Sequence, residues 1–169
     1  LLRHGRIDPI ELEGWTRELA SFGETVSAAR ERFLRALALA FDTVLIELAP
    51  ELGDIALSCR RGWDATLSFA EALDRAQASD REQGFTQSGP QRADVRVTVN
   101  GHVAADTLSR GQQKLVVTAL KLAQGRLLAD RGAEVLFLVD DLPSELDVER
   151  CERICRLLAE MPVQTIITC

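Results

Sequence analysis

The chain has 169 residues, and 46% of them are apolar, which is enough to form the core of one compact domain or slightly more. Its formal net charge of −6 argues against a protein that coats nucleic acid through bulk positive charge, because phosphate binding depends on clustered Lys and Arg. No run of residues is long and apolar enough to span a membrane, and no secretory signal pattern is present. We therefore expect a cytoplasmic protein, in which any contact with DNA would be local.

The candidates for local DNA contact are two small groups of arginines. Arg60 and Arg61 are adjacent in the sequence, and Arg92 and Arg96 flank a single aspartate. Two or three arginines near carboxylates are more commonly part of a solvated face, so these residues alone do not establish a DNA-binding surface.

A long amphipathic helix is predicted in the first third of the chain. No usable periodicity is present over residues 1–14, but further along apolar residues recur at steps of three and four. These residues are Val26, Ala29, Phe33, Leu37, Ala40, Val44 and Leu48. Pro50 and Gly53 end the pattern. At ~1.5 Å per residue, a helix over residues 21–48 would be about 40 Å long.

A strand, a helix and a hairpin are predicted next. Apolar and polar residues alternate over residues 55–59, as in a half-buried strand. Residues 67–83 are typical of a polar helix with one apolar side, and Gly84 ends it. Asn100-Gly101 joins alternating runs at 95–99 and 103–105, which is the strongest short signal for a hairpin.

A further helix is predicted to open near Ser109 and to continue to Leu128. Ser109 can accept a hydrogen bond from the first turn, and Gln112 can return it as a capping box. A helix N-terminus also binds phosphate, because its amides lack internal partners and the helix dipole is positive there. Taken alone, this turn is as compatible with an ordinary N-cap as with a phosphate site.

An uninterrupted apolar run over residues 135–139 ends in Asp140 and Asp141. This pattern is typical of a strand buried on both faces whose C-terminal edge reaches a ligand. The simpler alternative is a buried strand followed by an acidic turn. Residues 148–160 then favour a helix, with Asp147 as its N-cap, and residues 163–168 favour another strand.

The order and spacing of these features resemble the C-terminal lobe of an ABC-type ATPase, and most closely the RecF family. Residues 108–112 are similar to the signature motif, residues 135–141 to a Walker B strand, and residues 144–147 to the D-loop. The resemblance is strong over residues 62–168 and faint before them. It implies an α/β fold, a mixed sheet with flanking helices, with residues 1–52 as a helical arm segment and 53–169 as a partial ATPase lobe.

The resemblance also implies roles for individual residues. In the signature turn, five residues would bind the γ-phosphate of ATP held by a partner protomer: Leu108, Ser109, Arg110, Gly111 and Gln112. Asp140 would hold Mg²⁺ and Asp141 would polarise the attacking water, while Ser144 and Asp147 would serve the dimer interface. Arg110 stands where general ABC proteins often have glycine, and Asp141 where most have glutamate.

No Gly-x-x-x-x-Gly-Lys-Ser/Thr loop occurs in the sequence, so we expect this chain to be a fragment that does not hydrolyse ATP by itself. The intact RecF-like protein would be a slow DNA-dependent ATPase that forms an ATP-dependent homodimer. It would recognise DNA gaps and junctions between single-stranded and double-stranded DNA, and would work with RecO and RecR to load RecA.

Two other interpretations stay open, with a third that is weaker. One is another SMC-like ABC ATPase, in which the long helix would be the base of a coiled coil. The other is a non-enzymatic interaction module, in which Asp140 and Asp141 form only an acidic turn. A metal-dependent nuclease is the weaker third, because the sequence does not indicate where its additional acidic residues would lie.

Overall fold

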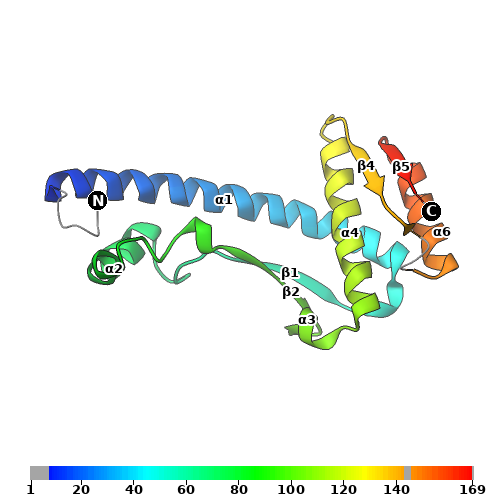
Figure 1. Cartoon of the computed structure of the whole chain (residues 1–169), viewed down its shortest axis with the longest axis horizontal. Coiled ribbons are helices and arrows are strands. Elements are labelled where there is room, and N and C mark those ends of the chain that lie inside the picture. Colours follow the sequence, from blue (N-terminus) through cyan, green and yellow to red (C-terminus); the bar gives the residue numbers. More distant parts are fainter. Residues whose placement is uncertain (1–7, 143–145, 169) are drawn as a thin grey trace. The chain divides into compact units, whose positions relative to one another are not determined.

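The computed structural model describes residues 8–142 and 146–168, which form two compact units. The first unit combines residues up to 33 with residues 58–96, and the second combines residues 34–57 with residues from 97 onward. One helix and two strands each contribute to both units: α1 (Pro9–Leu48), β1 (Ile55–Arg60) and β2 (Asp94–Val99) (Figure 1). The two compact units therefore do not match the predicted boundary after residue 52. The assignment of residues 1–52 to an arm and of 53–169 to an ATPase lobe stays a prediction.

Helix α1 begins earlier than the apolar periodicity predicts. Asp8 caps its first turn, because the Asp8 Oδ1 atom accepts a hydrogen bond of 2.8 Å from the amide of Ile10. Pro9 occupies the first helical position, where its missing N–H removes no intrahelical bond. The helix consequently has 40 residues. Asp8-Pro9 is a local start signal, which apolar periodicity does not reveal because residues 1–14 lack an apolar stripe.

The buried face of α1 differs between the two units. In the second unit Val44 and Leu48 are fully buried, as the periodicity predicts. In the first unit the prediction is wrong, since Val26 is 41% exposed and the buried positions include Ala20 and Ser27 instead. Ala20 belongs to a buried cluster with the larger residues Trp63 and Phe69 of the same unit. Although α1 is long, neither it nor any other described helix is apolar enough to cross a membrane.

The first unit has a small core around α2 (Phe69–Gln83). Phe69 is fully buried and stacks on Trp63 with ring centroids 4.5 Å apart. Ser68 begins α2 with a capping box, and Gly84 ends it in the left-handed conformation with a φ of 80°. The short 3-10 helix η3 (Pro90–Arg92) then leads into β2.

A three-stranded sheet has the order β1-β2-β3, with β3 limited to His102–Val103. Asn100 and Gly101 form the predicted hairpin turn with φ values of 49° and 81°, which Asn and Gly adopt more readily than other residues. The return strand is shorter than predicted. Residues from Ala104 onward turn into a one-turn helix, α3 (Ala104–Thr107), and cannot continue the pairing.

Besides α3 and the C-terminal part of α1, the second unit contains the helices α4 (Arg110–Ala129) and α6 (Val148–Glu160). It also contains a parallel pair of strands, β4 (Leu136–Val139) and β5 (Gln164–Ile167). The strands pair in register from Leu136 opposite Gln164 to Val139 opposite Ile167. Both helices contribute buried residues to the core, as does the C-terminal part of α1. The 3-10 helix η2 (Pro50–Leu52) adds Leu52 to the same core.

Among the described residues, only one face of β4 is covered. Phe137 and Val139 pack against the core, whereas Leu136 and Leu138 are 51% and 72% exposed. The prediction of a strand buried on both faces is therefore wrong for the described residues. The physical reason is that the core of the second unit packs against one side of the β4 and β5 pair, which leaves alternate side chains outside it.

Candidate functional site

The first turn of α4 is built by the predicted capping box. The Ser109 hydroxyl accepts from the amide of Gln112 at 3.3 Å, and the Gln112 side chain accepts from the amide of Ser109 at 2.9 Å. Gln113 fixes the approach to this turn, because its side-chain amide donates to the carbonyl oxygens of Ala105 and Leu108 at 3.0 and 2.9 Å. The local sequence is therefore sufficient to explain where α4 begins.

Packing within the chain does not explain why position 111 is a glycine. A Cβ atom placed at this position would meet no heavy atom within 4 Å, and the residue is exposed in the first turn of α4. The fold of this chain thus leaves room for a larger side chain there. A glycine with open space beside it is compatible with a close approach by something outside the chain, as at phosphate-binding helix N-termini.

Asp140 and Asp141 follow β4 and are held by a threonine that follows β5. The Thr168 hydroxyl donates to Asp140 Oδ1 at 2.6 Å and accepts from the amide of Asp141 at 2.9 Å. Because β4 and β5 are parallel, their C-terminal ends lie at the same edge of the sheet. The acidic pair is thus attached to the sheet edge by specific hydrogen bonds.

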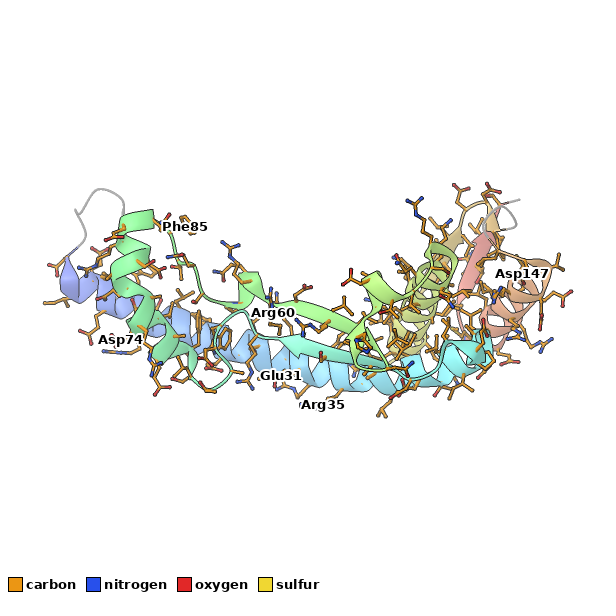
Figure 2. The ribbon with its side chains drawn as sticks, turned by 90° about the horizontal axis from the view of Figure 1, so that it is seen from below. Glu31, Arg35, Arg60, Asp74, Phe85 and Asp147 are labelled. Carbon is orange, nitrogen blue, oxygen red and sulfur yellow. The ribbon has the colours of Figure 1, made fainter. Side chains whose placement is uncertain are left out.

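Asp147 begins α6 (Figure 2), and its carboxylate accepts from the amide of Arg150 at 2.9 Å. This backbone hydrogen bond, together with the Arg150 guanidinium, lowers the pKa of Asp147. Arg150 also donates to Glu51 Oε1 at 2.6 Å, and this bond lowers the pKa of Glu51. The predicted N-cap role of Asp147 is confirmed. Ser144, the other predicted D-loop residue, lies outside the described residues.

The candidate residues line two separate hollows in the second unit. The larger, of about 730 Å³, is lined by Arg110 and by the carboxylate pair Asp140 and Asp141. The smaller, of about 360 Å³, brings the α4 turn together with the start of α6. Its polar lining consists of Ser109, Gly111, Gln112, Asp147 and Arg150. The structure thus groups Ser109, Gly111 and Gln112 of the signature-like turn with Asp147, whereas Arg110 of the same turn lies with the acidic pair.

The donor set at the strand ends fits Mg²⁺ only together with other ligands. Among residues 8–142 and 146–168, no group of three or more His, Cys, Asp and Glu side chains is arranged to hold a metal ion. Mg²⁺ is commonly bound by one or two carboxylates, with phosphate and water completing its shell. Asp140 and Asp141 meet that requirement, whereas a metal site made by protein side chains alone is not found in the described residues.

Comparison with known proteins gives a consistent result. The chain is 49% identical over 168 residues to the DNA replication and repair protein RecF of Azotobacter vinelandii, and 47% identical over 170 residues to that of Pseudomonas aeruginosa strain LESB58. Each alignment covers 99% of this chain and 46% of the relative. The chain is related to RecF along its whole length. It spans about half the length of these relatives.

Solved structures support the RecF fold. The chain superposes on the structure of the recombination mediator protein RecF-ATP in the RecFOR pathway with a TM-score of 0.79 and 22% identity. That match covers 100% of this chain and 48% of the solved chain, and the RecF-ATPrS structure gives a TM-score of 0.78. No protein-family model matches the chain. The predicted α/β fold, with sheets and flanking helices, is confirmed, and it is the fold of these RecF structures.

Sequence patterns did not identify two residues of the candidate site, Thr168 and Arg150. Thr168 was assigned only to a strand, although it ends a strand parallel to the one before Asp140, a placement at which ligand-binding residues gather. Arg150 gave no signal, because its partner Glu51 lies 99 residues away in the chain. Among the proposed DNA-contacting arginines, Arg61 is paired with Glu31 at 2.6 Å, and Figure 2 shows Arg60 on β1.

Proposed function

We propose that this chain is part of a RecF-type ATPase in which each nucleotide is shared between two protomers. The observation that carries the proposal is the distribution of the candidate residues over two hollows. One is lined by the acidic pair with Arg110, and the other by Ser109, Gly111 and Gln112 with Asp147. A site assembled from two protomers needs one surface for its own nucleotide and another for that of its partner. The two hollows supply one surface of each kind.

The α4 turn has the properties required for binding a partner's γ-phosphate. Its amides and the positive end of the helix dipole favour an anion, and Gly111 has open space where a phosphate would approach. Ser109 already caps its own helix, so this hydroxyl is positioned at the helix end before any ligand arrives. Leu108, which precedes the cap, packs against the core and anchors the turn.

Asp140 would hold Mg²⁺, which neutralises phosphate charge when it is bound, and Asp141 would orient the attacking water. An aspartate is one methylene shorter than the glutamate common at the second position, so water is held less closely and turnover is slow. Slow turnover suits a switch, because ATP then keeps two protomers together until hydrolysis removes the bridge. Asp147 and Ser144 would contribute to the same dimer interface.

The partners follow from the relatives. Proteins 47–49% identical to the chain are named DNA replication and repair protein RecF, and a solved relative is called a recombination mediator in the RecFOR pathway. We therefore propose that the full-length protein acts in the cytoplasm on gapped or junction DNA. It would work with RecO and RecR, and indirectly with RecA.

The test is Ser109→Arg in a protein of full RecF length that contains this chain. The substitution places bulk at the α4 turn, so ATP should still bind to each monomer while ATP-driven dimerisation is lost. Sedimentation with and without ATP measures the dimer, and nucleotide titration measures binding to the monomer. Ser68→Arg is the matched control, since Ser68 forms the same capping box at the start of α2 in the other unit.

The control should lose a comparable cap and keep the ATP-dependent shift to dimer. A normal shift in Ser109→Arg would show that the α4 turn is not part of a shared site. If the unsubstituted protein neither binds ATP nor dimerises with it, the alternative of a non-enzymatic interaction module is supported instead.

A further inference from the structure

The C-terminal ends of β4 and β5 are joined beyond the last paired residues. The amide of Thr168 donates to the carbonyl oxygen of Val139 at 2.9 Å, which continues the parallel ladder by one step and sets Thr168 beside Asp140. The backbone at this edge is therefore fixed before any side-chain contact is considered. Even a short side chain at position 168 is therefore long enough to reach Asp140.

The Thr168 hydroxyl uses both kinds of hydrogen bond that it can form. It accepts from the amide of Asp141, so its single proton is directed away from that amide and toward Asp140 Oδ1, at 2.6 Å. A hydroxyl that donates to a carboxylate makes a short, strong hydrogen bond. The Asp141 amide thus fixes the orientation of the Thr168 hydroxyl, and this hydroxyl fixes the orientation of the Asp140 carboxylate.

The backbone of Asp141 needs such support. Its φ of 48° lies in the left-handed region, which is costly for residues other than glycine and more tolerable for Asp and Asn than for most. The hydrogen bond from the Asp141 amide to Thr168 holds the chain in this turn. The backbone conformation at Asp141 therefore determines the directions of both carboxylates relative to the end of β4.

We propose that Thr168 is a positioning residue for the metal-binding carboxylate. It occupies Oδ1 of Asp140, leaves the second oxygen available to Mg²⁺, and fixes the peptide between Asp140 and Asp141. This inference rests on the proposed function, because it assigns Thr168 a role in the same site. Thr168 acts through Asp140 and Asp141 rather than on the nucleotide. A residue that follows β5 thereby affects the metal affinity of a carboxylate that follows β4.

The magnitude follows from metal sites in general. Loss of a group that hydrogen-bonds a metal-ligating side chain typically costs about 10–100-fold in metal affinity or activity. Thr168→Val keeps the branched shape of the side chain and removes only the hydroxyl. We expect the Mg²⁺ concentration for half-maximal nucleotide binding to rise about tenfold or more. Thr168→Ser keeps the hydroxyl and should restore most of the affinity.

A matched control lies on the same strand. The Thr165 hydroxyl is buried and has no hydrogen-bond partner among the described residues. Thr165→Val therefore makes the same chemical change on β5 without removing a bond, and the Mg²⁺ requirement should stay unchanged. Hydrogen exchange of the peptide that contains Asp141 gives a readout independent of nucleotide. Exchange of the Asp141 amide should become faster in Thr168→Val only.

The experiment uses the full-length protein and begins with the unsubstituted form. If that form shows no Mg²⁺-dependent nucleotide binding, the proposed function fails. If it binds nucleotide and Thr168→Val has the same Mg²⁺ requirement and the same exchange at Asp141, the positioning role of Thr168 fails while the proposed function stands. A rise in the Mg²⁺ requirement that Thr165→Val shares, or that Thr168→Ser does not correct, would also overturn the inference.

Discussion

Gly23 of α1 lies directly against the ring of Phe69. A Cβ atom at position 23 would stand 2.3 Å from Phe69 Cε1 and 2.4 Å from Cδ1. The ring cannot easily move, because Phe69 is fully buried and stacks on Trp63. This contact explains how a helix that presents small residues still forms a core in the first unit.

Gly23→Ala should destabilise the protein despite the higher helix propensity of alanine. Overpacking costs about 1–3 kcal/mol, and the gain in propensity is roughly 1 kcal/mol, so we expect a net loss of up to about 2 kcal/mol. Gly14→Ala is the control in the same helix, because a Cβ there meets nothing within 4 Å. Urea unfolding should show a gain of up to about 1 kcal/mol for the control. Equal changes in the free energy of unfolding for Gly23→Ala and Gly14→Ala would contradict the contact between position 23 and Phe69.

Gly111→Ala separates folding from function. Because no atom lies within 4 Å of the added Cβ, the free energy of unfolding should not fall, and the higher helix propensity of alanine should raise it. If a phosphate approaches the α4 turn closely, the same methyl group should weaken ATP-dependent dimerisation of the full-length protein. Thermal unfolding and sedimentation with ATP measure the two effects. A variant that dimerises normally would show that the turn is not approached closely.

The carboxylates Asp140 and Asp141 should have separable roles. Asp140→Asn removes charge at the metal and should weaken Mg²⁺-dependent nucleotide binding in the full-length protein. Asp141→Asn should spare binding and prolong the ATP-bound dimer, because only water activation is lost. Nucleotide titration and single-turnover hydrolysis distinguish these results. Unchanged turnover in both variants would mean that the acidic pair is structural.

Arg150 should contribute to stability in a pH-dependent way. It lowers the pKa of both Glu51 and Asp147 in the folded state, so its contribution is fully present above their ordinary values of about 4. The contribution is lost as the pH falls through the lower folded-state values. Arg150→Gln should therefore lower the Tm at pH 7, and the difference from the unsubstituted protein should shrink toward pH 2.

Arg156→Gln provides the control for that pH series. Arg156 lies on the same helix, is exposed, and makes no hydrogen bond or ion pair with a described residue. Its substitution should change the Tm little at any pH, because exposed charges without close partners contribute little to stability. A Tm difference for Arg150→Gln that stays constant between pH 7 and pH 2 would exclude the two carboxylates as its cause.

The sequence by itself determined the elements whose signals are local. Ser109 with Gln112 marks the start of α4, Asn100 with Gly101 marks the hairpin, and Asp147 marks the start of α6. Each signal acts within a few residues, because caps and turns satisfy backbone groups of their immediate neighbours. For the same reason the acidic pair after β4 and its resemblance to a nucleotide site were visible before the fold was known.

Only the tertiary structure decided which faces are buried and which distant groups meet. The apolar stripe of α1 predicted burial of Val26, whereas Gly23 is buried instead, because Phe69 supplies the bulk that the helix lacks. Thr168 reaches Asp140 across 28 positions of sequence only because β4 and β5 pair in parallel. Such relationships depend on register and packing between elements, and neither is encoded in the spacing of residues along one element.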